Sequence, residues 1–467
     1  MEYSAVNSLD NLILDITTLY ESSLATENEL KKAKSDWINV KEAGAKGDGL
    51  TDDTTIIREC LRHYNTLFFD SGIYNVTELD IDNKTLLSNH GVTIQTTGLS
   101  TNRNAIKLSG SCKIANIDFV QISIQPLLSL INSNNTIITN CTFKVPNDVT
   151  FTNGYVDIYS NNKDILFNNC RFEMLIGLSG GIWVRDANKN GITRNIRFKD
   201  CYIHHCGRDE SIAVWSWFGS VSNVYIDNCN FEMEYNIQRY HCISLGGGDE
   251  GLEGEEGNKI TGPSYIRNSN ISAKSIHCII KSGDSNGFIE NCTINGNNIE
   301  YTYAFKKAQL KNCHITNLNG KLCSTGSPTL IDCYISGQNY SIGGSINAYN
   351  TIFETSLTNK KSFIEYSGYF FHCTFNVNTG IFINFYSSNK ALRFIECIFN
   401  VTSSQLKLIN VSKGLENISI KIIGSYLPNI PSWVGAKNSG YICGCITESE
   451  LLIPNIVCTN NTICAWR

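Results

Sequence analysis

A short pattern of apolar and polar positions recurs along most of the chain. The pattern reads apolar, any residue, Asn or Asp, Cys, any residue, then an aromatic or aliphatic residue, with His372 and Glu396 in place of Asn or Asp in two copies. Cys and the second apolar residue lie two positions apart, so they share one face of a predicted β-strand. Ser269 and Asn350 take the Cys position in two further copies. The cysteines of the pattern are Cys141, Cys170, Cys201, Cys229, Cys292, Cys313, Cys333, Cys373 and Cys397.

The spacing of these cysteines gives a repeat length. Cys313 follows Cys292 by 21 residues, Cys333 follows Cys313 by 20, and Cys397 follows Cys373 by 24. Repeats this short, rich in β-branched residues and Asn, are typical of a solenoid of β-coils, in which stacking supplies the core. We therefore predict an all-β chain folded as a right-handed parallel β-helix. Its cysteines would form an internal ladder of buried apolar side chains, strung along the axis and not gathered around a metal.

The early coils are longer than the later ones. The step from Cys141 to Cys170 is 29 residues, the next two are 31 and 28, and the step from Cys229 to Ser269 is 40. Insertions in a solenoid go into loops, commonly on the binding face. The functional surface is therefore expected between about residues 150 and 290.

Both ends of the chain depart from the repeat. Residues 1–35 are predicted to form a short, weak amphipathic helical segment, which could associate with other copies or dock on the first coil. The β-helix is predicted over 36–426, with an N-terminal cap at 37–75. A solenoid needs a cap over its last strand edges, so 427–467 is predicted as a C-terminal capping segment. We interpret its four cysteines as buried thiols, with zinc binding as the alternative.

Composition and charge limit the classes of binding partner and the compartment in which the chain is expected to be made. The formal net charge is −5, which predicts no general binding of nucleic acid or anionic membrane. No signal peptide is visible in the first residues, and no apolar run is long enough to span a bilayer. The chain is expected to be made in a cytosol. An odd count of 19 cysteines then indicates reduced thiols and no disulfide framework.

Residues 37–75 carry a family resemblance. The stretch from Trp37 to Thr54, followed by the segment Leu67–Tyr74, resembles the opening motif of the pectate-lyase-like β-helix superfamily of phage tailspikes and polysaccharide depolymerases. In that superfamily the motif is structural, so its three aspartates, Asp48, Asp52 and Asp53, are expected to be structural, with Asp52 placed to cap the helix that follows. The resemblance implies a virion-attached homotrimer that acts on a bacterial surface glycan and contacts other tail proteins through its N-terminus.

A second strand appears when the coils are aligned on their ladder position. It covers 155–159, 182–185, 212–217, 241–244 and 277–281. If Val156, Ile158, Ile182, Val184, Ile212 and Val214 point inward, the alternate side chains point outward. Aromatic rings and polar groups on adjacent rungs suit a sugar chain. The outward set is Tyr155, Asp157, Tyr159, Trp183, Arg185, Trp215, Trp217, His241, His277 and Lys281.

Acidic residues beside this strand are the catalytic candidates. Glycoside hydrolysis needs two carboxylates, and we select Asp209 and Glu210, with Asp186 and Asp157 as facing partners. Substrate binding is assigned to a further set, in which Asp249 and Glu250 belong to an acidic loop that could instead be merely solvated or bind a cation. This set is Trp183, Arg185, Trp215, Trp217, Arg208, His241, Asp249 and Glu250.

The basic residues Lys189, Arg194, Arg197 and Lys199 add local positive charge, which suits an anionic glycan. No cofactor and no metal are assigned to the predicted site.

Three functions remain open. The first is a tailspike-like glycoside hydrolase. The second is a polysaccharide lyase, which needs a base and a group that neutralises a uronate. The third is a non-catalytic glycan-binding adhesin that uses the same surface. The candidate lyase residues are His204, Tyr240 or His241 as the base, and Arg185, Arg208 or Arg239 as the neutralising group.

Overall fold

The computed structural model describes residues 36–463 with gaps. The predicted helical segment 1–35 therefore lies outside the described residues. The described ranges are 36–98, 104–122, 127–145, 155–174, 181–186, 188, 190–206, 210–216, 219–234, 241–246, 262–274, 278–282, 287–323, 327–357, 362–379, 381–402, 407–411, 419–427, 433–434, 439–443, 446–447, 456–459 and 462–463.

The chain winds through long parallel sheets, each strand pairing with the corresponding strand one coil earlier and one coil later. We call the sheet whose strands precede the ladder cysteines sheet 1. Its strands are β1 (Trp37–Asn39), β3 (Thr66–Phe69), β6 (Thr85–Ser88), β9 (Lys113–Ala115), the second half of β11 (Leu128–Thr139), β14 (Lys163–Asn168), β17 (Ile192–Lys199), β20 (Ser220–Asp227), β23 (Ser264–Arg267), β26 (Gly287–Glu290), β30 (Gln309–Lys311), β32 (Thr329–Ile331), β34 (Ile346–Tyr349), β37 (Gly368–Phe371), β40 (Ala391–Ile395), β43 (Ser419–Ile423), β46 (Ser439–Cys443) and β48 (Ile456–Thr459).

Sheet 2 contains the strands that follow the ladder cysteines. They are β2 (Asp48–Asp52), β4 (Gly72–Val76), β7 (Val92–Thr96), β10 (Asp118–Gln121), β12 (Thr142–Val145), β15 (Arg171–Met174), β18 (Tyr202–His205), β21 (Asn230–Met233), β24 (Asn270–Ala273), β27 (Thr293–Asn295), β28 (Glu300–Tyr301), β31 (His314–Lys321), β33 (Tyr334–Ser341), β35 (Ile352–Ser356), β38 (Thr374–Asn378), β41 (Ile398–Thr402), β44 (Tyr426–Leu427), β47 (Ile446–Thr447) and β49 (Thr462–Ile463).

In each early coil, the strand of sheet 3 follows the strand of sheet 2 and precedes the next strand of sheet 1. Its strands are β5 (Leu79–Asp82), β8 (Ile106–Gly110), the first half of β11, β13 (Val156–Tyr159), β16 (Ile182–Asp186), β19 (Ile212–Ser216), β22 (His241–Leu245), β25 (Cys278–Ser282) and β29 (Phe305–Lys306). A four-stranded sheet takes the same place in later coils, with β36 (Ser362–Ile364), β39 (Ile381–Phe385), β42 (Lys407–Val411) and β45 (Trp433–Val434).

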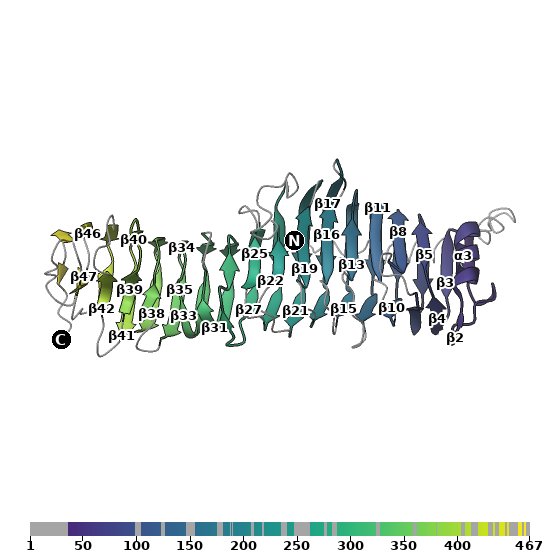
Figure 1. The fold of residues 1–467 in the computed structure, drawn as a ribbon, viewed down its shortest axis with the longest axis horizontal. Helices are drawn as coiled ribbons and strands as arrows, with labels where there is room; N and C mark the ends of the chain where they lie inside the picture. The colour runs from purple at the N-terminus through teal and green to yellow at the C-terminus, as the bar shows by residue number, and fades with distance from the viewer. Residues whose placement is uncertain are drawn as a thin grey trace, which may run out of the picture.

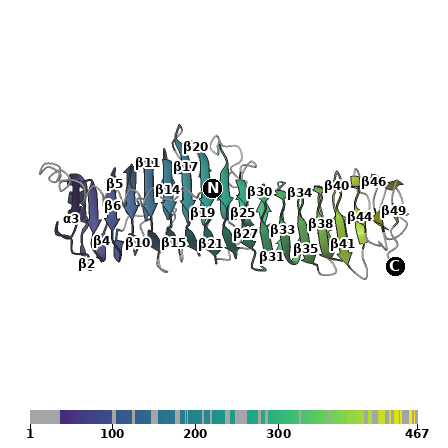
Figure 2. The same ribbon diagram turned by 180° about the vertical axis from the view of Figure 1, so that it is seen from behind.

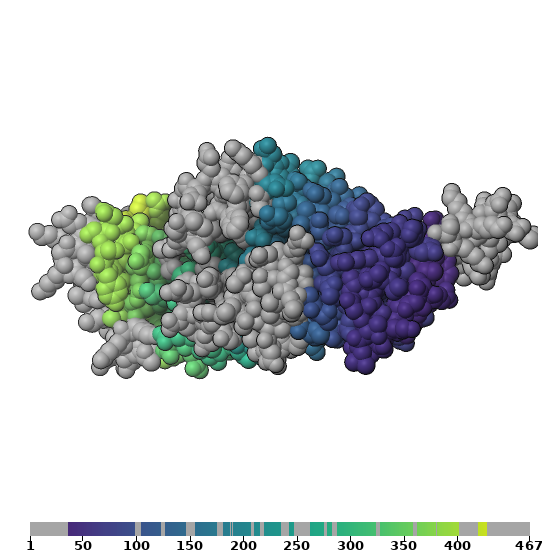
Figure 3. Space-filling model, turned by 45° about the vertical axis from the view of Figure 1, so that its right-hand side comes forward, coloured from purple at the N-terminus to yellow at the C-terminus, as the bar shows by residue number. Residues whose placement is uncertain are grey.

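The coils follow one another along the long axis in chain order (Figure 1). Seen from behind, β14, β17 and β20 lie side by side in sheet 1 (Figure 2), and the space-filling view shows the same progression from purple to green (Figure 3). Strand pairing is parallel throughout the described residues, as expected for a solenoid whose coils contact only their neighbours. The predicted parallel β-helix is confirmed, and connections between parallel strands are almost always right-handed.

The turn between sheets 1 and 2 explains the recurring Asn or Asp. The residue before each ladder cysteine has φ between 49° and 55°, a left-handed conformation that Asn and Asp tolerate better than most residues. Neighbouring turns also bond to each other, because Asn169 Nδ2 donates to Asn140 Oδ1 at 2.8 Å and Asn312 Nδ2 to Asn291 Oδ1 at 2.8 Å. The turn thereby fixes the register of the two strands that flank it.

The cysteine ladder is confirmed in the described residues. All nine of its members are buried free thiols, and each thiol lies near the carbonyl oxygen two residues earlier, as Cys141 does with Thr139 at 3.2 Å. One predicted member is wrong by one position. Asn350 has φ 46° and is the turn residue, whereas Thr351 is buried in the Cys position and donates to Tyr349 O at 2.9 Å.

The opening motif has a structural role, but Asp53 and not the predicted Asp52 is the N-cap residue of the helix, and its side chain makes no capping hydrogen bond. Helix α3 (Thr54–His63) lies beside β3 and β5 at the N-terminal end of the stack (Figure 1). Asp52 Oδ1 accepts from Thr54 N at 2.9 Å, while the buried Asp53 carboxylate accepts from Lys46 N at 2.7 Å and Gly47 N at 3.0 Å. These aspartates hold the turn and the start of the helix, so they act as structural residues.

Strand pairing continues past Tyr426. β46 pairs with β43 and β48, and β47 pairs with β44 and β49. Coils of the β-helix therefore extend into the segment for which the sequence predicts a cap. Among the described residues, no helix has both the length and the apolar character needed to cross a membrane.

Candidate functional site

The outer face of sheet 3 carries the predicted site. The six residues expected to point inward here, from Val156 to Val214, have no exposed surface. Their neighbours face outward, and pairing aligns Asp157 with Trp183, Ala213 and Ser244 on successive coils. Several outward residues are nonetheless buried, including Asp157 at 6% exposed and Lys281 at 5%. This face is therefore an enclosed surface and not an open one.

Arg185 is the centre of an ordered cluster on this face. Its guanidinium donates to both carboxylate oxygens of Asp157, from Nε at 2.9 Å and from Nη2 at 2.6 Å. The same guanidinium carbon lies 4.9 Å from the ring centre of Tyr159 and 4.7 Å from that of Trp183. A two-point ion pair between aromatic rings fixes the plane of the guanidinium. Burial raises the pKa of Asp157, and the hydrogen bonds and charge of Arg185 oppose that rise.

Asp186 has a different environment, although it follows Arg185 directly. It is fully buried, and its carboxylate accepts from Asn161 N at 2.9 Å, Asn188 N at 3.0 Å and Thr193 Oγ1 at 3.0 Å. A methyl group added at Gly191 would lie 2.0 Å from its Oδ1. The carboxylate therefore fills a tight turn between β16 and β17, where it satisfies two backbone N–H groups.

The other predicted residues are placed only in part. Glu210 is half-buried, and its carbonyl accepts from Gly181 N at 2.8 Å, which places it one coil after the start of β16. The remaining members of the predicted site lie outside the described residues, or their side chains do. These are Asp209, Arg208, Trp217, Asp249 and Glu250, together with the side chains of Trp215 and His241.

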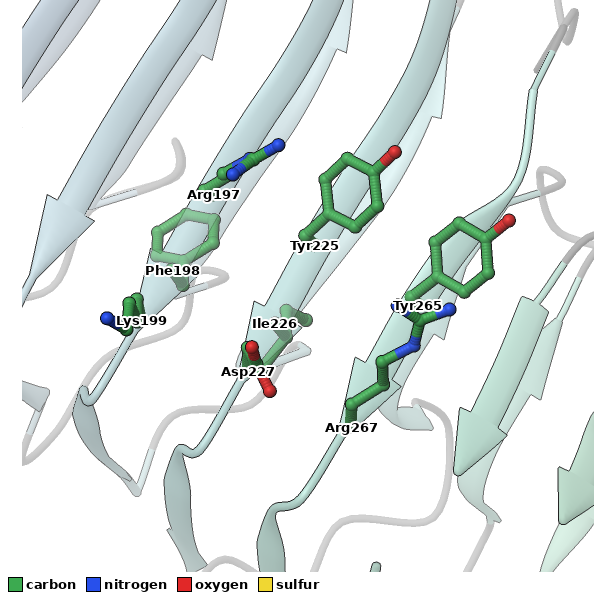
Figure 4. A pocket seen from close by; sticks show the side chains of 8 residues that line it. All are labelled: Arg197, Phe198, Lys199, Tyr225, Ile226, Asp227, Tyr265 and Arg267. Atoms are coloured by element: carbon green, nitrogen blue, oxygen red, sulfur yellow. The ribbon is translucent and has the colours of Figure 1, made fainter. Parts of the chain in front are cut away.

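A second surface, on the outer face of sheet 1, forms an open groove of about 190 Å³. The rings of Tyr225 and Tyr265 stack across neighbouring strands with centres 5.3 Å apart and planes 3° apart. Arg197 lies 5.2 Å from the ring centre of Tyr225, and Arg267 lies 4.4 Å from that of Tyr265. In Figure 4 both hydroxyl groups and the Arg197 guanidinium point away from the strands in the same direction. The groove thus presents a row of hydrogen-bond donors.

The charge of this groove is positive. Arg197, Lys199 and Arg267 line it together with one carboxylate, Asp227, which accepts from Asn268 Nδ2 at 2.9 Å. Two of these cations are partly neutralised by carboxylates beside the groove, because Glu290 Oε2 lies 3.1 Å from Arg267 Nε and Asp200 Oδ2 lies 3.8 Å from Lys199 Nζ. Because ring stacking exposes the electropositive edges of the tyrosines, ring edges, hydroxyls and cations all favour an anion. Guanidinium groups are also the side chains best suited to two-point recognition of carboxylate or phosphate.

Sequence reasoning found two of the eight residues that line this groove. Arg197 and Lys199 belong to the basic run noted in the sequence, whereas Tyr225, Tyr265 and Arg267 were not selected. A signal is present in the sequence, because Tyr225 and Tyr265 each lie three residues before the turn residue of their coil, as Arg197 does, and Arg267 lies one residue before its turn residue. Arg197, Tyr225 and Tyr265 occupy equivalent positions in adjacent strands.

Comparisons with known proteins give distant likenesses only. No protein-family model and no curated protein matches the chain. Tailspike protein 3 of bacteriophage CBA120 is 10% identical, with 95% of this chain and 69% of that chain covered and a TM-score of 0.43. The surface adhesin PfbA of Streptococcus pneumoniae is 13% identical, with 87% and 90% covered and a TM-score of 0.42.

A third similar structure is the family 28 exopolygalacturonase of Yersinia enterocolitica, 13% identical, with 82% of this chain and 78% of that chain covered and a TM-score of 0.39. At these identities and TM-scores the likenesses carry no inference about activity. The strand pairing itself confirms the parallel β-helix that the sequence resemblance implies.

Proposed function

We propose that this chain is a tailspike-like depolymerase, a glycoside hydrolase that cleaves an acidic bacterial surface polysaccharide and is carried by the virion as a homotrimer. The observation that supports it best is the groove on sheet 1, in which Arg197 and Arg267 lie against stacked tyrosines. A groove that crosses several coils accepts an extended polymer, and its donors suit the carboxylates and hydroxyls of an acidic sugar chain.

The catalytic residues of this proposal are Asp209 and Glu210. Of the four carboxylates selected from the sequence, two already accept hydrogen bonds within the chain. Asp157 accepts from Arg185, and Asp186 accepts from two backbone N–H groups and a hydroxyl. We assign Asp157 a positioning role, since it fixes Arg185, and Asp186 a structural role in its turn. Glu210 and Asp209 are then the pair that supplies a general acid and a base or nucleophile.

The proposal is tested by digesting purified capsular and cell-wall polysaccharides with the full chain. We expect new reducing ends without the ultraviolet absorbance of unsaturated uronates. Glu210→Gln and Asp209→Asn should each lower turnover by about 100-fold or more while polymer binding survives. If both variants retain full turnover on a polymer that the wild type cleaves, the catalytic assignment is wrong.

Binding through the groove is tested separately. Arg197→Gln should weaken binding of the cleaved polymer by about tenfold or more, because it removes a charge-assisted hydrogen-bond donor. Arg393→Gln is the matched control, since Arg393 occupies the equivalent outward position several coils later in sheet 1 and lies outside the groove. Equal losses in both variants would show that general charge, and not this groove, holds the polymer.

A polysaccharide lyase is the second candidate, and Arg185 is the observation that favours it. A guanidinium fixed by Asp157 and two rings is suited to neutralise the carboxylate of a uronate. In the digestion, reducing ends together with ultraviolet absorbance would show a lyase. Polymer binding with neither product would show an adhesin, and absence of binding to any acidic polymer would contradict all three functions.

A further inference from the structure

Three potential metal ligands converge on the outer face of sheet 2, at the end nearest sheet 3. His204 belongs to β18, Cys206 follows that strand directly, and Glu234 follows β21 one coil later. His204 Nε2 lies 3.5 Å from Cys206 Sγ and 3.7 Å from Glu234 Oε2. One atom from each residue lies within 4.8 Å of the other two.

The backbone explains why these side chains meet. His204 and Cys206 are two positions apart, so both leave the same face of the chain. Glu234 N donates to His205 O at 3.1 Å, in line with the pairing of β18 and β21. This pairing brings Glu234 beside Cys206, although the two are one full coil apart in the sequence. The arrangement is therefore set by strand β18 and by the first residue after each of the paired strands β18 and β21.

The distances match a zinc site. Tetrahedral Zn²⁺ has bonds of about 2.0–2.2 Å to nitrogen or oxygen and about 2.3 Å to sulfur, which places neighbouring ligand atoms about 3.3–3.6 Å apart. The two distances from His204 Nε2 lie in or close to this range without any movement of the strands. Imidazole, thiolate and carboxylate together are the donors of a borderline divalent cation such as Zn²⁺ and not of Ca²⁺ or Mg²⁺.

Cys206 differs from the other cysteines in the described part of the chain. It is half-exposed, whereas every other described free cysteine is buried. The cysteine ladder explains most of those buried thiols, but Cys206 contributes nothing to the core. The neighbouring cation is Lys274, whose Nζ lies 3.7 Å from Glu234 Oε1, the carboxylate oxygen turned away from His204.

From this geometry we infer that His204, Cys206 and Glu234 bind a divalent transition-metal ion of the zinc type. Three protein ligands leave one position of a tetrahedral ion open for water or an oxygen ligand, as in zinc sites that bind exchangeable groups. The site is separate from the proposed hydrolase residues, because none of its ligands lies in the sheet 1 groove or in the pair Asp209 and Glu210. It assigns His204 a role as a metal ligand in place of the role as lyase base that the sequence left open.

The test titrates the full-length reduced chain with Zn²⁺ and with Co²⁺. The wild type should bind one more Zn²⁺ per chain than Cys206→Ser. Both proteins keep the four C-terminal cysteines, so any ion that these hold does not affect the difference. Bound Co²⁺ should give thiolate charge-transfer absorption that Cys206→Ser lacks. His204→Gln and Glu234→Gln should each weaken binding by more than the roughly 10-fold to 100-fold typical of an outer-shell change.

Lys274→Gln is the matched control, and it should tighten Zn²⁺ binding because it removes a competing cation from Glu234. A second measurement needs no variant and follows the rate at which Cys206 is alkylated in the wild type. Zn²⁺ should lower this rate, and a chelator should restore it. Equal Zn²⁺ stoichiometry in wild type and Cys206→Ser, together with unchanged alkylation of Cys206, would overturn the site.

Discussion

At the scale of one residue, Asp186 and Asp157 show that the groups around a carboxylate decide its role. Both were selected as facing partners of a catalytic acid, and both are buried. Asp157 lies against a guanidinium, whereas Asp186 accepts from two backbone N–H groups and a hydroxyl. The first arrangement fixes the orientation of a cation, and the second compensates backbone donors that burial would leave unpaired.

Replacement of Asp186 separates a structural from a catalytic carboxylate. Asp186→Asn places an amide donor where three donors already point, so we expect a loss of about 1–3 kcal/mol in the free energy of unfolding. Turnover per folded molecule should not change. Asp80→Asn, at an exposed position of the same sheet, should cost little. A 100-fold loss of turnover in folded Asp186→Asn would identify Asp186 as catalytic after all.

The cysteine ladder makes a second prediction at residue scale. Cys292 is 2% exposed, and its thiol lies 3.2 Å from Glu290 O. Cys292→Asp buries a carboxylate beside carbonyl oxygens, so we expect a destabilisation of more than about 4 kcal/mol in denaturant unfolding.

Cys292→Ser is the matched control. Ser269 and Ser425 occupy the same position in other coils and donate to the carbonyl two residues earlier at 2.6 and 3.1 Å. Serine should therefore be tolerated at position 292. Equal stability of Cys292→Asp and Cys292→Ser would contradict the buried ladder.

At the scale of elements, the turn before α3 is held by a carboxylate with a low pKa. Asp48 accepts from Leu50 N, Thr51 N and Thr51 Oγ1 at 2.7–2.9 Å. Hydrogen bonds from the Thr51 and Leu50 backbone lower the pKa of Asp48 from 3.8 to about 2. A lowered pKa means that the stabilising contribution is complete above pH 3.8 and is lost as the pH falls through about 2.

We therefore expect Asp48→Asn to be less stable than wild type near pH 6, and the difference to shrink as the pH falls toward 2. The measurement is denaturant unfolding of both proteins across this pH range. A difference of constant size at all pH values would show that the charge of Asp48 contributes nothing to the turn.

At the scale of the whole molecule, the assembly state remains a prediction. The amphipathic pattern of residues 1–35 and the tailspike resemblance favour a homotrimer with closed cyclic symmetry. Light scattering at micromolar concentration should return three times the 52.0 kDa chain mass. Deletion of residues 1–35 should weaken attachment to the virion more than glycan cleavage. A monomer mass for the full chain would contradict the prediction.

The sequence by itself determined the repeating coil. Its cysteines, its Asn or Asp turn residues and its alternating strands are local features, because a side-chain period of two and a left-handed residue before each ladder position fix strand and turn together. The ladder and the parallel pairing followed from these patterns, whereas the structural role of the opening aspartates followed from the family resemblance. The prediction at Asn350 was wrong by one residue, because Thr351 takes the Cys position and its hydroxyl donates to the carbonyl two residues earlier, as those of Ser269 and Ser425 do.

Only the tertiary structure decided which side chains meet across coils. Arg197, Tyr225 and Tyr265 share a groove, and Glu234 reaches His204, because the turns hold neighbouring strands in register over insertions of different length. No constant spacing in the sequence marks such contacts. Loop length varies from coil to coil, whereas the register between neighbouring strands is kept. For the same reason the sequence could not show that Asp157 holds Arg185 while Asp186, a neighbour of Arg185 in the chain, bonds instead to the turn.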